Sequence, residues 1–151
     1  MEYETRFFGT VDLSDDKVLT FEEGIMGFPD MKRWTILYDK DRGENAPVSW
    51  LQSLDESGFA MPIISPFSLV DTYSPLVEDE LLAPLGNFKD EDLLIFLSLS
   101  VPVGRPADTT ANFKAPFIIN PENRRGIQII VDNEDYDIHT KVADLVKKTK
   151  A

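Results

Sequence analysis

Residues 109–120 read Thr-Thr-Ala-Asn-Phe-Lys-Ala-Pro-Phe-Ile-Ile-Asn, and this stretch is the strongest indication of the fold. Much of it has the apolar character of a buried β-strand. Packing alone does not require the asparagine, lysine and proline that precede the apolar triplet at residues 117–119, nor the asparagine that ends it. We therefore expect a core strand over residues 111–119 in which these polar and proline positions have a further role.

Short apolar segments separated by turn residues lie on both sides of this stretch. Leu93–Val101 is the clearest strand, because its first half has no polar residue and its second half alternates with serine. Pro62 favours an edge or a bulge for the strand that contains it. Regular spacing of the segments favours an antiparallel barrel or sandwich over a parallel α/β sheet. The other expected strands are residues 3–9, 18–21, 34–38, 48–54, 59–64 and 127–131.

Helical segments are expected to be few and short. One begins at Ser74-Pro75, where proline suits the first turn, and ends at Gly86. Another is an amphipathic C-terminal helix with Val142 and Leu145 facing inward. The expected helical ranges are residues 31–33, 76–85 and 138–148, and a polar turn is expected over residues 39–45.

The size of the chain fits one folded unit. With 151 residues and a hydrophobic share of 42%, it is long enough to bury a substantial core. We therefore expect a single, mainly β domain over residues 1–151, with one or two short helices.

The chain is strongly acidic, with 27 Asp and Glu against 15 Lys and Arg and a net charge of −12. The excess lies in the middle, because residues 44–104 contain ten acidic residues and a single basic one, Lys89. Nucleic acids require a basic binding surface, so direct contact with DNA or RNA is not expected. The acidic segment is either a solvated face or a docking surface for a basic protein.

Patterns typical of catalysis and metal binding are missing from the sequence. It has no cysteine and one histidine, His139, which argues against thiolate chemistry and His-rich metal sites. The acidic run Asp132–Asp137 lacks the glycine and the final glutamate of a calcium loop. The Gly24–Gly27 loop follows two glutamates, which would repel phosphate. We therefore expect no enzyme activity and no cofactor or metal.

The sequence also predicts the compartment. Its first residues, Met-Glu-Tyr-Glu-Thr, lack the positive region and apolar stretch of a signal peptide. The longest nearly apolar run, Leu93–Val103, is shorter than the ~20 residues of a membrane-spanning helix. The lack of cysteine fits a reducing environment. We therefore expect a cytoplasmic protein that does not bind membranes.

Four segments together resemble the family of flagellar assembly factors called FliW. Two are Leu19–Phe28, with the sequence Leu-Thr-Phe-Glu-Glu-Gly-Ile-Met-Gly-Phe, and Trp50–Asp55, with the sequence Trp-Leu-Gln-Ser-Leu-Asp. The others are Ala111–Asn120 and Gly126–Ile130. They occur in the family's order and span most of the chain. Three positions carry a different apolar residue from the family's usual one: Met26, Phe113 and Phe117.

The resemblance implies a small antiparallel β-barrel-like domain that is not an enzyme and binds two proteins. One is flagellin, which the factor holds in the cytoplasm before export, in the manner of a chaperone. The other is CsrA, a small basic dimer that binds mRNA and regulates translation. Factor that is freed when flagellin is secreted binds CsrA and relieves its repression of flagellin translation, which couples synthesis to export.

The acidic middle segment is the candidate surface for a basic partner. A purely solvating role for its side chains is an equal alternative. Long-range charge mainly accelerates encounter, so affinity is expected to come from a few buried apolar anchors. The candidate partner-binding residues are Asp55, Glu56, Asp71, Glu78, Asp79 and Glu80.

The family-motif residues are expected to have mainly structural roles. Glycines 24, 27 and 126 and Pro116 would set backbone geometry. Asn112 and Asn120 would bond backbone groups rather than a partner. Phe28, Trp50 and Phe96 are expected in the core. The motif residues are Gly24, Gly27, Phe28, Gln52, Asn112, Pro116 and Asn120.

Two alternative functions stay open. One is a β-barrel that holds a small molecule in an apolar cavity, which a well-packed interior would argue against. The other is an acidic mimic of nucleic acid that inhibits a basic protein other than CsrA.

Overall fold

The computed structural model describes residues 1–38 and 48–149, so the polar turn expected over residues 39–45 lies outside the described residues. Within these ranges, no helix is long and apolar enough to cross a lipid bilayer. The strands are β1 (Glu2–Glu4), β2 (Thr10–Asp12), β3 (Leu19–Thr20), β4 (Arg33–Leu37), β5 (Val48–Ser53), β6 (Ala60–Ile64), β7 (Leu94–Ser100), β8 (Thr110–Ala111), β9 (Phe117–Asn120), β10 (Arg125–Gln128) and β11 (Thr140–Lys141). The 3-10 helices are η1 (Asp15–Lys17), η2 (Pro66–Ser68), η3 (Asp79–Leu85), η4 (Asp90–Asp92) and η5 (Pro106–Asp108), and the α-helix is α1 (Val142–Thr149).

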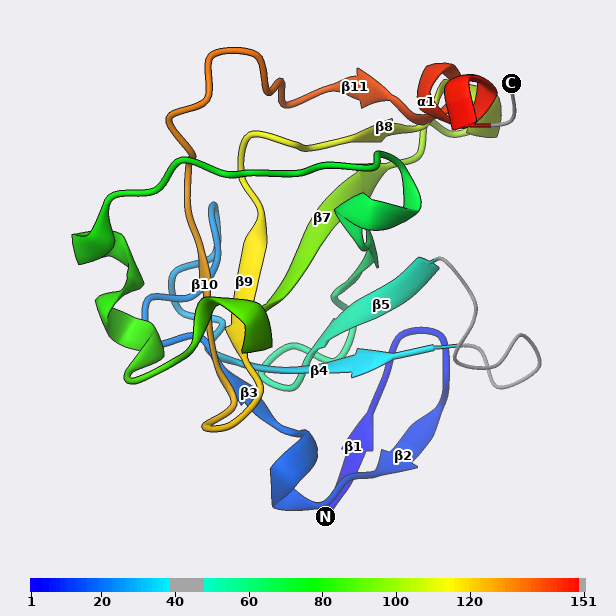
Figure 1. Ribbon diagram of the computed structural model, residues 1–151. Helices are drawn as coiled ribbons and strands as arrows, with labels where there is room; N and C mark the ends of the chain where they lie inside the picture. The colour runs from blue at the N-terminus through cyan, green and yellow to red at the C-terminus, as the bar shows by residue number, and fades with distance from the viewer. Residues whose placement is uncertain (39–47, 150–151) are drawn as a thin grey trace.

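Seven strands close into a barrel in the order β7-β6-β5-β4-β3-β10-β9, because β9 also pairs with β7 (Figure 1). β7 changes neighbour along its length: Leu94–Phe96 pairs with β9, and the last two residues pair with β8, which in turn pairs with β11. The expected mainly β, barrel-like fold is confirmed. One pair differs from the expected antiparallel pattern, because β3 and β10 run parallel and join at Thr20 and Arg125.

The interior of the barrel is filled by side chains. The Phe21 ring lies edge to face with Trp34 and Phe117, at centroid distances of 6.4 and 6.2 Å. A Cβ atom at Gly126 would lie 2.5 Å from the Phe21 ring, so glycine allows β10 to pack this closely. This packing argues against a ligand cavity inside the barrel, and therefore against the small-molecule alternative. The fully buried side chains here also include Leu51, Ile63 and Ile119.

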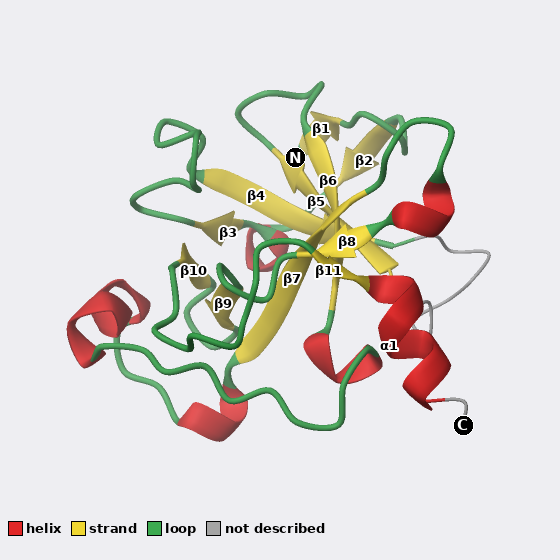
Figure 2. Cartoon of the chain, turned by 90° about the horizontal axis from the view of Figure 1, so that it is seen from above, coloured by secondary structure: helices red, strands yellow, loops and turns green. Residues whose placement is uncertain are grey.

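Two apolar clusters cover the outside of the barrel. In one cluster, the buried Leu85 of η3 packs against Ile118, Ile127 and Ile129. These isoleucines face outward from β9, from β10 and from the segment that follows β10. In the other, α1 packs Val142 and Leu145 near β8 and β11, as Figure 2 shows for the helix. The inward orientation predicted for these two α1 side chains is confirmed.

The helix expected over residues 76–85 is shorter than predicted and of the 3-10 type. Leu76 cannot join it, because its N–H donates to Asn133 Oδ1 (2.6 Å) and its carbonyl accepts from Asp132 N–H (2.8 Å). These bonds hold the chain extended up to Asp79, where η3 begins. The predicted end is confirmed, since Gly86 adopts a positive φ of 72°.

The strand expected over residues 111–119 is interrupted. β8 ends at Ala111 and β9 begins at Phe117, with a turn between them. Asn112 makes this turn, because its Oδ1 accepts the N–H groups of Lys114 and Ala115, both at 3.0 Å. The bonds that we expected from Asn112 to backbone groups are therefore present.

Four other local expectations are wrong. The strand expected over residues 3–9 ends at Glu4, because the chain then turns back toward β2 and Thr5 N–H donates to the Gly9 carbonyl (2.9 Å). Residues 31–33 form no helical turn, because Arg33 already belongs to β4. Residues 138–141 are not helical, because the β11–β8 pairing holds the end of this segment extended. Phe28 is 38% exposed and Trp50 is only partly buried, so neither is a fully buried core residue, whereas Phe96 packs against the central core as expected.

Candidate functional site

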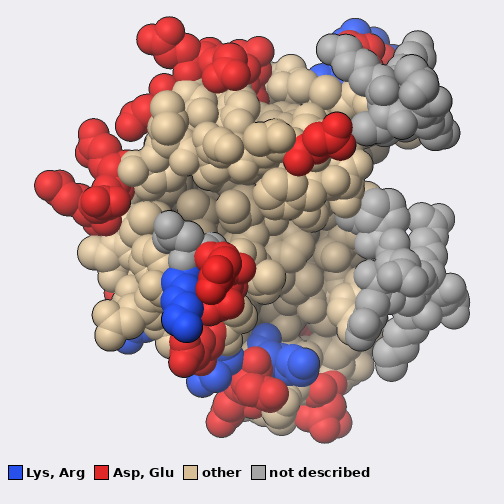
Figure 3. Space-filling view, viewed as in Figure 1, with Lys and Arg blue, Asp and Glu red and all other residues tan. Residues whose placement is uncertain are grey.

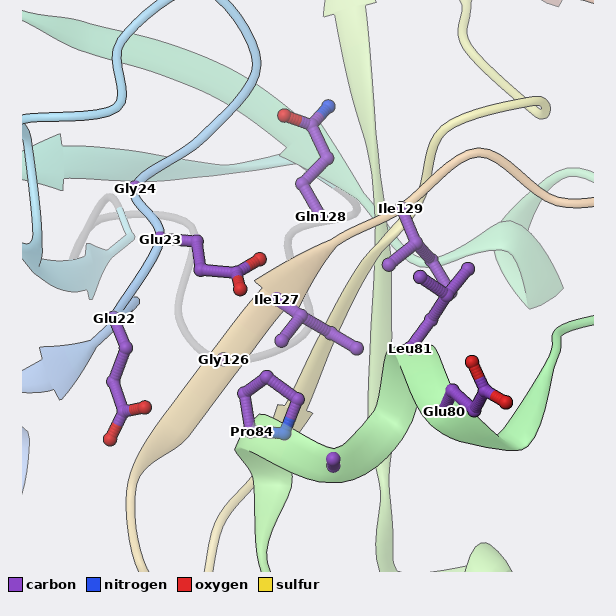
Figure 4. Close-up of a pocket in the computed structure, with 11 residues that line it drawn as sticks. Glu22, Glu23, Gly24, Glu80, Leu81, Pro84, Gly126, Ile127, Gln128 and Ile129 are labelled. Atoms are coloured by element: carbon purple, nitrogen blue, oxygen red, sulfur yellow. The ribbon is translucent and has the colours of Figure 1, made fainter.

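A groove of about 410 Å³ lies beside β10, between the loop that follows β3 and the helix η3 (Figure 4). Glutamates stand on both sides of it: Glu22 and Glu23 on the loop, and Glu80 on η3. Apolar side chains of β10 and η3 line the rest, among them Ile127 and Leu81. The groove thus combines an apolar lining with negative charge, which suits a basic segment of another protein.

Glycines shape the loop on one side of the groove. Gly24 has a φ of +68°, and a Cβ atom there would clash with the backbone of Phe28 and Pro29. Ile25 and Phe28 close the tip with two backbone hydrogen bonds, of 3.2 and 2.8 Å. Gly27 at this tip has a φ of +86° and open space around it. Only glycine therefore fits position 24, whereas position 27 needs only the conformation.

Gln128 ties this loop to the barrel. Its Oε1 accepts the N–H of Met26 (2.9 Å), and its Nε2 donates to the carbonyl of Ala115 (3.2 Å). One side chain on β10 therefore connects three of the four family segments. Gln128 was not among the predicted site residues, although its place in the last family segment was a signal that could have identified it.

Two asparagines hold the other side of the groove. Asn120 is 1% exposed and donates from Nδ2 to the carbonyls of Leu85 (2.9 Å) and Asn87 (3.0 Å). Asn123 donates to the same Leu85 carbonyl (2.8 Å). Both asparagines belong to β9 or to the turn after it, so they anchor the end of η3 to the barrel. The backbone bonds expected of Asn120 are present.

The remaining motif residues also have internal contacts. Gln52 is fully buried: its Oε1 accepts the N–H of Arg6, and its Nε2 donates to the carbonyls of Ser53, Ser57 and Phe59, at 2.9–3.1 Å. Pro116 is buried, and its carbonyl accepts from the N–H of the residue after β10. Exposed Phe28 stacks its ring edge to face on Phe59, with centroids 4.6 Å apart.

The six candidate acidic residues do not form one site. Glu78, Asp79 and Glu80 stand together at the start of η3, and Figure 3 shows acidic side chains protruding where η3 lies in Figure 1. Glu80 is the member of the set that lines the groove. The others lie on the β5–β6 turn (Asp55, Glu56) and after η2 (Asp71). Glu22 and Glu23 were not predicted as site residues, because they lie outside the acidic middle segment.

Asp55 has a structural role of its own. Its carboxylate accepts the N–H groups of Lys32 (2.8 Å) and Arg33 (2.9 Å) and pairs with the Arg33 guanidinium at 2.9 Å. Burial opposes its charge, but these hydrogen bonds outweigh burial and lower the pKa of Asp55. Its oxygens therefore fasten the β5–β6 turn to the start of β4.

The charges of the groove are mostly uncompensated. Glu22 forms an ion pair with Arg125 at 3.5 Å. Within the described part of the chain, neither Glu23 nor Glu80 has an ion-pair partner, and no cluster of His, Asp and Glu is arranged to hold a metal ion. The unpaired carboxylates of Glu23 and Glu80 can therefore attract a positively charged group of another molecule.

The fold and this surface define a class: a small closed β-barrel with a packed interior and an acidic groove on its outside. Sequence comparison gives the family. The family model described as "FliW protein" matches residues 2–142. The chain is 46% identical to a flagellar assembly factor FliW of Lachnoclostridium phytofermentans, over 98% of this chain and 97% of that protein. It is 40% identical to another of Lachnospira eligens, over 98% of both.

A solved structure gives the same answer. The crystal structure of a flagellar assembly factor FliW superimposes with a TM-score of 0.84 at 29% identity, covering 94% of this chain and 96% of that one. The chain belongs to the FliW family of flagellar assembly factors. The resemblance inferred from four sequence segments is thereby confirmed, and a role in flagellar assembly follows.

Proposed function

We propose that this protein is a non-catalytic cytoplasmic adaptor, formed by a single domain over residues 1–151, that binds flagellin before export. When free of flagellin, it binds CsrA and relieves CsrA's repression of translation. The observation that carries the proposal is membership of the FliW family across residues 2–142. An acidic surface with apolar elements supports it, because such a surface suits a small basic regulator.

We assign the first contact with CsrA to the acidic start of η3. Glu78, Asp79 and Glu80 are all exposed, and none forms an ion pair within the described residues. Uncompensated exposed carboxylates raise the association rate of a basic partner. Leu81, 42% exposed on the same helix, is an apolar anchor that such a partner would cover.

Purified proteins test the adaptor role. Flagellin and CsrA should each form a complex with this protein in a pull-down, and added flagellin should release CsrA from it. A pull-down that recovers neither partner would contradict the proposal. Recovery of a different basic protein from a cell extract, with no CsrA, would favour the acidic-mimic alternative.

Charge reversal tests the surface. Replacing Glu78, Asp79 and Glu80 by lysine should slow CsrA association by about tenfold at low salt and flatten its salt dependence. A matched control replaces Asp132, Glu134 and Asp135, which are also exposed, with the same change in net charge. Equal slowing in both variants would mean that net charge, not this face, sets the rate.

A further inference from the structure

The strand β10 has one edge that is only partly paired. Ile129 N–H donates to the Pro116 carbonyl (3.4 Å) and Val131 N–H to the Lys114 carbonyl (2.9 Å), continuing the antiparallel register of β9 and β10. In such a register, alternate residues direct their N–H and C=O groups to opposite edges. Gln128 and Ile130 therefore direct their backbone groups away from β9.

On the other edge of β10, the neighbouring strand β3 forms only one residue pair with it. Thr20 N–H donates to the Arg124 carbonyl (2.9 Å), and Thr20 opposite Arg125 is the single register pair of β3 and β10. The next residue, Phe21, donates its N–H to Lys32 instead, which directs the chain toward β4. Beyond this point, β3 offers no partner to β10.

The open stretch also ends at a defined place. Asp132 N–H, the next group that faces this edge, donates to the Leu76 carbonyl (2.8 Å). Between Thr20 and Leu76, the backbone groups of Gln128 and Ile130 have no hydrogen-bond partner on this side among the residues that the structure describes. The unpaired stretch corresponds in length to an added strand of roughly three to five residues, at about 3.4 Å per residue.

This open edge begins in the acidic groove. Gln128 is one of its lining residues, and Ile130, 58% exposed, continues the same edge. Figure 4 shows Glu22 and Glu23 projecting from one side of β10 and Glu80 standing on η3 at the other. A strand added to this edge would therefore have a carboxylate near each of its two faces, because its side chains alternate between them.

We propose that the groove binds an extended, basic peptide segment of a partner protein, which adds as a short strand to β10 at Gln128 and Ile130. Main-chain hydrogen bonds supply binding that is independent of sequence, and Lys or Arg side chains facing the glutamates supply selectivity. A second copy of this chain is a poor occupant, because it would bring an equally acidic groove to the same edge. This site shares Glu80 and Leu81 with the surface proposed for CsrA, but its test reads the β10 edge directly and can fail without affecting the pull-downs.

The probe is the peptide acetyl-Lys-Val-Lys-Val-Lys-amide, added to the full chain labelled with ¹⁵N at low salt. We expect saturable binding, with shifted amide signals at Gln128 and Ile130 and exchange with solvent slowed by at least about tenfold. Two control peptides carry N-methyl groups on the backbone nitrogens, one at the valines and one at the lysines. Each therefore lacks the hydrogen-bond donors along one edge of the peptide strand. One should lose binding and the other should keep it. The peptide with glutamates in place of lysines should not bind.

Variants of the protein test the charges and the edge. Replacing Glu22, Glu23 and Glu80 by glutamine should weaken binding by about two- to fivefold for each glutamate on the face of the strand that carries the lysines. The control replaces three exposed glutamates outside the groove: Glu2, Glu91 and Glu134. Ile130→Pro removes a donor and should abolish binding, whereas Ile130→Thr should retain it.

Three results would overturn the proposal. The first is the absence of saturable binding at low salt. The second is binding without slowed exchange at Gln128 and Ile130, which would place the peptide elsewhere. The third is slowed exchange at these amides in the free protein at high concentration, together with dimers in sedimentation, which would make a second copy the occupant. The N-methylated peptides keep the test valid even if Ile130→Pro does not fold.

Discussion

Single polar residues connect segments that lie far apart in the sequence. Asn120 reaches the backbone at Leu85 and Asn87, Gln128 reaches Met26 and Ala115, and Asp55 reaches Lys32 and Arg33. The sequence indicated that the two motif asparagines bond backbone groups. It did not indicate which groups, because those contacts depend on tertiary structure. Asp55 was predicted to lie on a partner-binding surface because its structural contacts also depend on tertiary structure. Its hydrogen-bond partners lie more than twenty positions earlier in the sequence.

Asn120→Ala should destabilise the fold. It removes two donated bonds to the backbone carbonyls of Leu85 and Asn87 and one accepted from Glu122 N–H, so we expect a loss of about 1–3 kcal/mol in the free energy of unfolding. Urea denaturation measures it. Asn87→Ala is the control, because that side chain is exposed and should change stability by less than about 0.5 kcal/mol. Equal losses in the two variants would contradict the role given to Asn120.

Asp55→Asn should make stability less sensitive to acid. Hydrogen bonds lower the pKa of Asp55 in the folded state below its ordinary value of 3.8, so its ionised form stabilises the fold above that pH. This contribution is lost as the pH falls through the lowered folded pKa. The variant should therefore be destabilised at pH 7 and much less so at pH 2, as measured by urea denaturation at both. Glu56→Gln, at the exposed neighbouring position, should have little effect at either pH.

At the scale of elements, the strands were predictable and the interruptions were less so. Residues 34–38, 48–54 and 59–64 lie close to β4, β5 and β6, since alternation and β-branched composition are local signals. Pro62 occupies a local edge, as predicted, because β6 pairs with β7 only from Ile63 onward. The late start of η3 was not predictable, because bonds from residues near position 132 hold the preceding chain extended.

The glycine loop gives a prediction at this scale. Gly24→Ala should destabilise the protein by at least about 2 kcal/mol more than Gly27→Ala. Both positions have a positive φ, but the added methyl clashes with backbone only at position 24. Thermal unfolding of the two variants measures the difference. Similar losses would mean that the loop shifts to admit the methyl group.

At the scale of the whole molecule, the barrel closes through pairings between distant parts of the chain. The parallel pairing of β3 with β10 and the change of neighbour along β7 were not predicted, because local patterns do not specify which strands meet. The family resemblance, which spans the chain, identified the barrel where local patterns left a sandwich open. The net charge of −12 is also a property of the whole chain and affects stability in its own right.

Added salt should stabilise the protein. Repulsion among its excess carboxylates opposes the compact state, and salt screens it. Raising NaCl from 10 to 300 mM should raise the thermal midpoint by about 3 °C, equivalent to roughly 1 kcal/mol. Asp55→Asn should show the same rise in the thermal midpoint. This variant separates the screening of general repulsion from the screening of the ion pair that Asp55 forms. A fall in the midpoint would mean that favourable ion pairs dominate.

The seam between β3 and β10 has a consequence for biosynthesis. Thr20 and Arg125 pair across about 105 positions of sequence, so the first strands of the barrel leave the ribosome long before the strand that closes it. At translation rates of about 5–20 residues per second, they wait roughly 5–20 s. During this time Phe21 and Trp34 have no closed barrel to bury them, and the emerging chain is exposed to aggregation or to capture by chaperones.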